Sequence, residues 1–243
     1  MCERIDDTGF GGIKVIQKPG LGYGVDSVLL AAFAAGETGA SRIKDGALIA
    51  DLGSGSGIVG FVLCHKIKTV HVVGIEKREN ACDRAKRAAE LNGLQDRIQF
   101  VMSDVTDYKS AEKYDAVVSN PPYFRQDAAI PCATDDKFVA RHETTANIGD
   151  FASAAARLLE AGGDFWLVHR PDRLADIFQA MRDNGIEPKE MQMVVPRQGE
   201  AANIVLIHGI KNAGRELKIL PEIVVHTENG GYTDLIERLY ERK

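Results

Sequence analysis

From residue 47 onward the chain repeats one pattern: a short apolar run, a polar or glycine-containing turn, and then a segment with helical periodicity. Parallel strands need a crossover of a dozen or more residues, usually a helix, so this alternation predicts a mostly parallel sheet covered by helices. The apolar runs lie at residues 47–52, 70–75, 98–102, 114–119 and 164–168, and the helical segments lie at 58–65, 78–92, about 150–160 and about 171–184. The expected fold is a single doubly wound α/β sheet.

The C-terminal part departs from this alternation. Residues 191–195 and 203–208 are apolar and flank a polar stretch, which predicts an antiparallel hairpin that closes the sheet. Gly162 and Gly163 predict a turn between the preceding helix and its strand.

The N-terminal part also precedes the repeat rather than joining it. Residues 12–17 predict a short strand and residues 19–24 a glycine-rich turn. A largely buried helix is expected from about residue 26, with Asp26 and Ser27 in its first turn able to cap the free amides. We therefore expect residues 1–45 to form an extension of one domain that spans residues 1–243.

Composition limits the classes that this chain can belong to. With 243 residues, 44% of them hydrophobic and 27% charged, it can bury the core of one large α/β domain. The absence of an apolar run of membrane-spanning length, and charged residues near Met1, predict a cytoplasmic protein without a membrane partner. Nothing in the sequence sets an oligomeric state.

Cysteine and histidine usage predicts no metal site. The four cysteines show no C-x-x-C spacing, and the six histidines form no motif that would place ligands on one helix face. The formal net charge of −5 argues against a protein that coats nucleic acid nonspecifically, because phosphate neutralisation supplies most of that affinity. A local basic patch remains compatible with this charge, at residues 77–87 or at residues 125–141.

A glycine-rich turn follows the first strand of the repeat. In the stretch 51–57, Gly53, Gly55 and Gly57 alternate with other residues, so the backbone can turn tightly and approach a ligand at the start of a helix. The overlapping stretch 55–60 also satisfies the G-x-G-x-x-G pattern of dinucleotide-binding proteins. Asp51 lies outside that pattern and suits the ammonium group of an amino acid.

Acidic residues follow the next two strands. Glu76 ends one apolar run and can accept hydrogen bonds from both hydroxyls of a ribose. Asp104 follows the next run and can accept one from an adenine amino group. Because the carboxyl ends of parallel strands meet at one edge of a sheet, both should lie beside the glycine turn.

The stretch 120–123 follows a further apolar run and suits a planar amine. The Asn120 side-chain oxygen and the Pro121 carbonyl can accept the amine hydrogens, and Pro121 and Pro122 restrict the backbone that aims them. Tyr123 can stack on a flat substrate, a contact worth about 1–3 kcal/mol for a nucleic-acid base. Asn120, Pro121, Pro122 and Tyr123 are therefore the candidate catalytic residues.

Together these motifs resemble the class I S-adenosylmethionine-dependent methyltransferases that methylate amines. The resemblance implies a Rossmann-like methyltransferase sheet with S-adenosylmethionine as cofactor and no metal. It assigns cofactor binding to the glycine turn and the acidic residues, and less specifically to the N-terminal segment. The implied cofactor residues are Asp26, Ser27, Asp51, Gly53, Gly55, Gly57, Glu76, Asp104 and Asn120.

Within this branch the chain resembles the tRNA adenine-N6 methyltransferases that act beside the anticodon of a valine tRNA. The stretches 18–33 and 140–143 add to that resemblance, which implies an RNA substrate. Other methyltransferase substrates stay open: guanine in ribosomal RNA, adenine in DNA, or glutamine in a protein. A dehydrogenase or other nucleotide-binding module is the alternative from another class. Residues 124–148 contain no obvious element, and a loop of this length could close over a substrate.

Overall fold

The computed structural model describes residues 3–18, 23–123 and 146–241. Its strands are β1 (Arg4–Asp7), β2 (Lys14–Gln17), β3 (Leu48–Leu52), β4 (His71–Glu76), β5 (Ile98–Met102), β6 (Tyr114–Ser119), β7 (Leu159–His169), β8 (Ile186–Val195), β9 (Ile204–Lys211) and β10 (Lys218–Val224). Its helices are α1 (Val25–Ala34), α2 (Ile58–Lys66), α3 (Glu79–Leu91), α5 (Ile148–Leu158), α6 (Leu174–Asp183), α7 (Asp234–Leu239) and the short 3₁₀ helix η1 (Pro171–Arg173).

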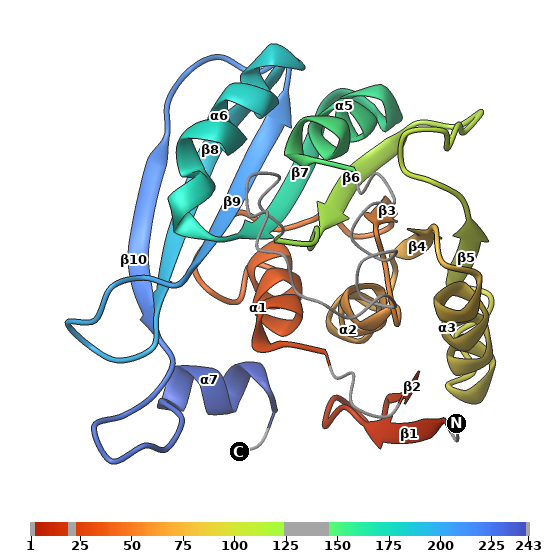
Figure 1. Ribbon diagram of the computed structural model, residues 1–243, viewed down its shortest axis with the longest axis horizontal. Helices are drawn as coiled ribbons and strands as arrows, with labels where there is room; N and C mark the ends of the chain where they lie inside the picture. The colour runs from red at the N-terminus through yellow and green to blue at the C-terminus, as the bar shows by residue number, and fades with distance from the viewer. Residues whose placement is uncertain (1–2, 19–22, 124–145, 242–243) are drawn as a thin grey trace, which may run out of the picture.

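Eight of these strands form one sheet in the order β10-β8-β9-β7-β6-β3-β4-β5. Figure 1 shows the sheet running from β10 at one edge to β5 at the other. Strands β3 to β7 pair in parallel, whereas β9 runs antiparallel to both β7 and β8. The predicted parallel α/β sheet with an antiparallel C-terminal hairpin is confirmed.

The strand order reverses at β3. From β3 the chain moves outward through β4 to β5, and then returns to place β6 on the other side of β3. In the parallel register, Leu52 at the end of β3 lies opposite Ser119 at the end of β6, and the Ser119 hydroxyl donates to the Leu52 carbonyl at 2.9 Å. The segments that follow these two residues therefore start side by side, at the position where ligands bind in such sheets.

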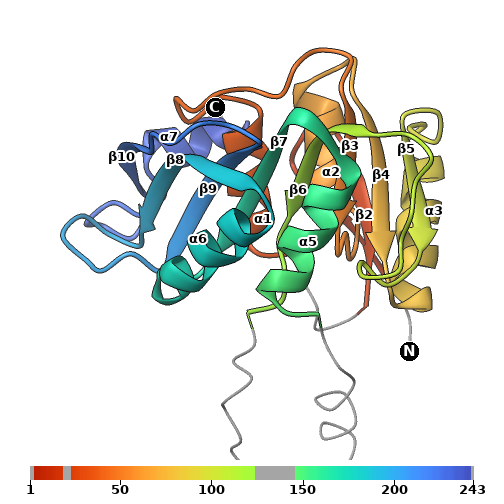
Figure 2. The same ribbon diagram turned by 90° about the horizontal axis from the view of Figure 1, so that it is seen from above.

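Helices cover both faces of the sheet (Figures 1 and 2). One core cluster contains side chains of α1, α2, α3 and α7, and the other contains side chains of α5 and α6. Helix α1 is buried from Ser27 to Ala34, and Phe33 meets Trp166 of β7 edge to face with ring centroids 5.1 Å apart. Close burial of α1 against the sheet fixes the position of its first turn.

The start of α1 differs from the prediction. Gly24 is the N-cap residue and no side chain caps the helix, so the capping role assigned to Asp26 and Ser27 is wrong. Their side chains contact the segment after β6 instead. The predicted strand before this helix is β2, which forms a separate two-stranded antiparallel sheet with β1.

Two further predictions need correction. Strand β10 pairs in parallel with β8, so the β8–β9 hairpin does not form the edge of the sheet. Gly162 and Gly163 lie inside β7, where the pairing with β6 shifts register between Tyr114 and Ala116. The positive φ of 79° at Gly162 indicates a local irregularity within the strand rather than a turn between elements.

Candidate active site

The glycine turn between β3 and α2 is held by the neighbouring strand. The backbone amides of Gly53 and Ser54 both donate to the Ile75 carbonyl of β4, at 2.9 and 3.0 Å. Gly53 and Gly57 have φ angles of +73° and +80°, which side chains other than hydrogen rarely allow. A Cβ on Gly57 would also lie 2.5 Å from the Phe100 ring. Glycine at position 57 is thus required by both conformation and space.

Glu76 connects the end of β4 to this turn. Its buried carboxylate accepts the Gly55 amide at 2.8 Å through Oε2. Oε1 accepts the backbone amide and the Nε of Arg78, at 2.9 and 2.8 Å. A carboxylate oxygen can accept two hydrogen bonds, so Oε2 keeps one acceptor position after binding Gly55.

Asp51 ends β3 with its carboxyl group buried beneath the turn. Burial raises its pKa to about 7, the negative charge of Glu76 acts in the same direction, and the Gly60 amide opposes both. Its Oδ2 atom is buried and has no hydrogen-bond partner. A buried, unpaired carboxyl oxygen is costly unless a ligand supplies a donor, so this atom fits a cationic or hydrogen-bonding group.

Asp104 follows β5 and is held in place by its neighbours. Its Oδ1 accepts from the backbone and hydroxyl of Thr106, at 3.0 and 2.9 Å, and its Oδ2 lies 3.1 Å from the Lys77 ammonium. Partial burial raises its pKa, but the bonds from Thr106 and the charge of Lys77 outweigh it and leave the pKa below its ordinary value. The side chain is therefore a charged acceptor at the carboxyl edge of the sheet.

A cleft of about 290 Å³ opens between the glycine turn, the N-terminal segment and the segment after β6. Of the residues predicted to bind cofactor, it is lined by Ser27, Asp51, Gly53, Gly55 and Asn120. Gly57, Glu76, Asp104 and Asp26 do not line it. Glu76 nevertheless supports the cleft through its bond to the Gly55 amide.

Gln17 is a lining residue that the sequence did not reveal. It is buried at the end of β2, and its Nε2 atom has no hydrogen-bond partner. The cleft thus contains an unpaired amide donor at Gln17 and an unpaired carboxyl acceptor at Asp51. Such a pair complements the carboxylate and ammonium groups of an amino acid. Nothing in the pattern around Gln17 marked it, because a short strand with one glutamine has no specific signature.

The segment Asn120–Tyr123 lies beside the cleft and is tied to α1. Asn120 Nδ2 donates to the Ser27 hydroxyl at 2.9 Å. The Tyr123 hydroxyl lies 2.8 Å from Asp26 Oδ2 and 2.8 Å from Asn120 Oδ1. Pro121 is buried and Pro122 exposed. The structure therefore brings Asp26 and Ser27 to the candidate catalytic segment.

The Tyr123 ring is packed on more than one side. The Arg170 guanidinium lies 5.6 Å from the ring centroid, and the His169 ring meets it edge to face at 5.0 Å. The Arg170 amide donates to His169 Nδ1 at 2.8 Å, which makes that nitrogen an acceptor. Burial lowers the pKa of His169, so this ring is neutral at physiological pH. His169, the last residue of β7, and Arg170, which follows it, were not predicted as site residues because no sequence motif marks them.

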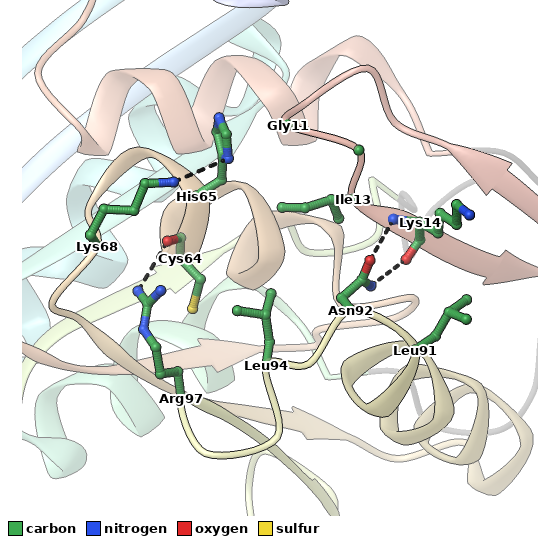
Figure 3. Close-up of a pocket in the computed structure, with 11 residues that line it drawn as sticks. Gly11, Ile13, Lys14, Cys64, His65, Lys68, Leu91, Asn92, Leu94 and Arg97 are labelled. Carbon is green, nitrogen blue, oxygen red and sulfur yellow. Dashed lines mark hydrogen bonds between the residues drawn. The ribbon is translucent and has the colours of Figure 1, made fainter.

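A second hollow, of about 340 Å³, lies at the opposite end of α2 (Figure 3). Here Asn92 exchanges two hydrogen bonds with the backbone of Lys14, and Arg97 donates to the Cys64 carbonyl at 3.0 Å. Burial raises the pKa of Cys64 to about 11, which keeps its thiol protonated and unreactive. The Asn92 bonds join β2 to the end of α3, and the Arg97 bond joins the segment before β5 to α2, so these contacts are structural.

Other predicted features can be compared with the described part of the chain. In it, no group of histidine, cysteine and acidic side chains is arranged to hold a metal ion. No helix there is long and apolar enough to cross a membrane. In the first basic group, Lys77, Arg78 and Arg87 pair with carboxylates, and Arg78 and Arg84 line the cleft. The second basic group and the stretch 140–143 lie outside the described residues. So does the long segment 124–148 expected to close over a substrate, except for residues 146–148, which lead into α5.

Comparison with known proteins identifies related sequences. A family model described as methyltransferase small domain matches residues 28–184. A protein of Bacteroides thetaiotaomicron named tRNA1(Val) (adenine(37)-N6)-methyltransferase is 29% identical over 220 residues, which cover 89% of each chain. A protein of the same name from Aeromonas hydrophila is 32% identical over 215 residues, covering 87% of this chain and 85% of the relative.

Solved structures share the fold. A predicted O-methyltransferase from Agrobacterium tumefaciens matches with a TM-score of 0.71 and 24% identity, over 89% of this chain and 95% of that one. A putative RNA methyltransferase from Pyrococcus horikoshii matches with a TM-score of 0.53 and 17% identity, over 76% and 82% of the two chains. These identities support the shared fold alone.

Proposed function

Since this chain belongs to the methyltransferase small domain family and is an S-adenosylmethionine-dependent methyltransferase, we propose that it methylates the N6 amine of an adenine in RNA, namely the adenosine beside the anticodon of a tRNA. The observation that carries the proposal is the register of β3 and β6, which sets the glycine turn directly beside Asn120. A cofactor site and an amine-binding segment thereby share one cleft. The names of the two curated relatives supply the substrate class.

The cofactor when bound supplies a methyl group on a positively charged sulfur. Asp51 and Gln17 provide the unpaired acceptor and donor that suit its amino-acid end. Gly53 and Gly55 allow the backbone to approach it, and Glu76 keeps an acceptor position for a ribose hydroxyl. Asp104 is assigned the adenine amino group. These roles extend the predicted cofactor residues by one, Gln17.

The substrate amine is aligned by the segment after β6. An exocyclic amine on an aromatic ring is a weak nucleophile because its lone pair is delocalised over the ring. Asn120 Oδ1 and the Pro121 carbonyl accept its two hydrogens and favour a pyramidal nitrogen that can attack the methyl carbon. With the cofactor bound, the nitrogen would take its methyl group, the sulfur would keep the bonding electron pair, and the extra proton on nitrogen would pass to water. The protein's contribution is alignment and charge stabilisation.

Several positively charged side chains surround this cleft despite the acidic net charge. Lys18, Arg78 and Arg84 line it, and Arg170 lies over the Tyr123 ring. Cations at this edge can contact RNA phosphates while the rest of the surface stays acidic. A target base must be turned out of its stack to reach Asn120, and Tyr123 is placed to receive it.

We further propose that residues 1–243 act as one methyltransferase domain, to whose cofactor site residues 1–45 contribute. Gln17, Lys18, Gly24 and Ser27 support this, because all four line the cleft. A cytoplasmic location would give such an enzyme access to tRNA.

Label transfer tests the substrate. The wild-type protein is incubated with S-adenosylmethionine carrying a labelled methyl group and with separate pools of tRNA, ribosomal RNA, DNA and release factor. We expect label in tRNA, and N6-methyladenosine after digestion to nucleosides. Label confined to protein would reject RNA as the substrate, and label in guanosine or in DNA would support one of the other amine acceptors. Calorimetry with NAD and with S-adenosylhomocysteine tests the dehydrogenase alternative. That alternative requires that the protein bind NAD tightly and not bind S-adenosylhomocysteine.

A further inference from the structure

Asp26 and Ser27, the first two polar residues of α1, do not cap the helix, and their side chains contact more than the cleft. Gly24 caps the helix without help from a side chain, and Asp26 does not line the cleft. Asp26 and Ser27 instead contact the two ends of the segment Asn120–Tyr123. The buried position of α1 holds these side chains fixed relative to β6.

The hydroxyl of Tyr123 has one proton and two acceptors. Asp26 Oδ2 and Asn120 Oδ1 each lie 2.8 Å from its oxygen. Burial, followed by the negative charge of Asp26, raises the pKa of Tyr123 above its ordinary value, so the hydroxyl keeps its proton. A carboxylate is a stronger acceptor than an amide carbonyl, and a bond to it is roughly twice as strong. The proton therefore points to Asp26.

The Asn120 oxygen keeps both of its acceptor positions by this choice, whereas a bond from Tyr123 would occupy one of them and weaken the other. Its Nδ2 donates to Ser27, which turns Oδ1 away from Ser27 and toward Tyr123. With the Tyr123 proton bound to Asp26, Oδ1 receives no hydrogen from within this group of four side chains. The same oxygen is the one that the proposed reaction uses to accept a hydrogen of the substrate amine.

We propose that Asp26 is a positioning residue, whose carboxylate draws the Tyr123 proton away from Asn120 Oδ1 and leaves that oxygen with its full acceptor strength for the substrate amine. This inference rests on the proposed methylation of an amine. It replaces the cofactor-binding role that the family resemblance implied for Asp26. A carboxylate at this position would also repel the carboxylate of the cofactor, whereas Gln17 at the cleft would attract it.

A double-mutant cycle tests the inference. kcat for tRNA methylation and the Kd of S-adenosylhomocysteine are measured for the wild type, Asp26→Ala, Tyr123→Phe and the double variant. In Asp26→Ala the Tyr123 hydroxyl turns to Asn120 and competes with the amine, so kcat should fall about tenfold, the scale of one hydrogen bond. The Kd should stay unchanged. In the Tyr123→Phe background no competing proton exists, and adding Asp26→Ala should change kcat less than about twofold.

Three results would overturn the inference. Equal falls in kcat in both backgrounds would mean that Asp26 only supports the fold, and weaker binding of S-adenosylhomocysteine would make Asp26 a cofactor ligand. The third result comes from neutron diffraction of the wild-type protein, an experiment that needs no substrate and no variant. A deuteron on the Tyr123 hydroxyl that points to Asn120 instead of Asp26 would overturn the inference. If the wild type transfers no methyl group to any amine while the deuteron points to Asp26, the proposed function fails separately. Asp96→Ala, which removes an exposed carboxylate elsewhere, is the matched control.

Discussion

Asn120 is the residue at which the two halves of the site meet. It lines the cleft proposed to bind the cofactor, and it also contacts Ser27 and Tyr123. A side chain with both kinds of neighbour could serve the cofactor, the substrate or both. Because its side-chain oxygen points toward Tyr123, in the segment proposed to bind the substrate, we assign Asn120 mainly to the substrate amine.

Substitution of Asn120 separates these roles. Asn120→Ala removes the acceptor that the proposed reaction uses in its transition state, and kcat should fall about 100- to 1,000-fold, as for loss of one preorganised hydrogen-bonding group. The Kd of S-adenosylhomocysteine, measured by calorimetry, should change little. An equal loss of cofactor affinity would show that Asn120 is mainly a cofactor ligand. Gln99→Ala, at an exposed position on β5, controls for nonspecific effects.

As a proposed cofactor ligand, Asp51 should make cofactor binding depend on pH. Burial raises its pKa to about 7, so the carboxyl group is largely neutral at pH 5.5 and largely ionised well above pH 7. The α-amino group of a ligand stays mostly protonated up to about pH 7.5. Affinity for S-adenosylhomocysteine should therefore rise between pH 5.5 and 7.5, because the ionised carboxylate attracts the ammonium.

Calorimetry across this pH range gives the dependence directly. In Asp51→Asn, which cannot ionise, the affinity should be lower and the dependence on pH should disappear. If the affinity of Asp51→Asn for S-adenosylhomocysteine still changed with pH as in the wild type, the titrating group would be another residue. The same raised pKa also implies that Asp51 lowers the stability of the ligand-free protein as pH rises from about 4 through 7, since the unfolded chain ionises more readily.

At the scale of elements, the turn between β3 and α2 has a backbone conformation that depends on contacts with neighbouring strands and side chains. Gly57, the N-cap residue of α2, has a left-handed conformation, and a Cβ at this position would collide with Phe100 of β5 and Phe61 of α2. The backbone amides of Gly53 and Ser54, within the turn, also donate hydrogen bonds to the Ile75 carbonyl of β4. Three elements thus fix the shape of the cleft before any ligand binds.

Gly57→Ala should disturb this turn. A positive φ costs a residue with a Cβ about 1–2 kcal/mol, and the crowded aromatic rings add about 1–3 kcal/mol. We expect a loss of roughly 2 kcal/mol or more in the free energy of unfolding, measured by urea denaturation, together with weaker binding of S-adenosylhomocysteine. Gly93→Ala is the matched control, because it also has a positive φ of 62° but no atom near its added Cβ. Equal losses in the two variants would mean that the aromatic contact contributes nothing.

At the scale of the whole molecule, cofactor binding should stabilise the fold. The cleft is built by the N-terminal segment, the β3 turn and the segment after β6, so a ligand there contacts parts far apart in the sequence. S-adenosylhomocysteine at 100 times its Kd should raise the free energy of unfolding by about 2.7 kcal/mol. For a chain of this size that corresponds to an increase in Tm of roughly 5–10 °C.

Thermal unfolding followed by circular dichroism measures this increase. NAD at the same concentration should leave Tm unchanged, which makes it the matched ligand control. A rise with NAD alone would contradict the methyltransferase assignment. A rise with both would indicate a cleft that recognises only the adenosine part.

Much of the fold was already predictable from the sequence. The apolar run of β6 was placed at the residues the structure shows, because a central parallel strand is buried on both faces and reads as a continuous apolar segment. The run of β5, at the edge of the sheet, was also placed at its residues. The N-terminal β1, the edge strand β10 and the helix α7 were not predicted. β1 and α7 are short, and β10 contains Pro221 and buries only Leu220 and Ile223 among exposed neighbours, so local patterning marks these elements weakly.

The sequence by itself determined the parallel core, the glycine turn, the acidic strand ends and the segment Asn120–Tyr123, because backbone geometry and strand burial leave direct signatures in residue type and spacing. Only the tertiary structure decided what these side chains contact. It placed Asp26 on Tyr123 instead of at a helix cap, brought Gln17 of β2 to the cleft, and set Arg170 over the Tyr123 ring. Those contacts join residues far apart in the chain, and they depend on how α1, β2 and β7 meet the sheet, which no local spacing records.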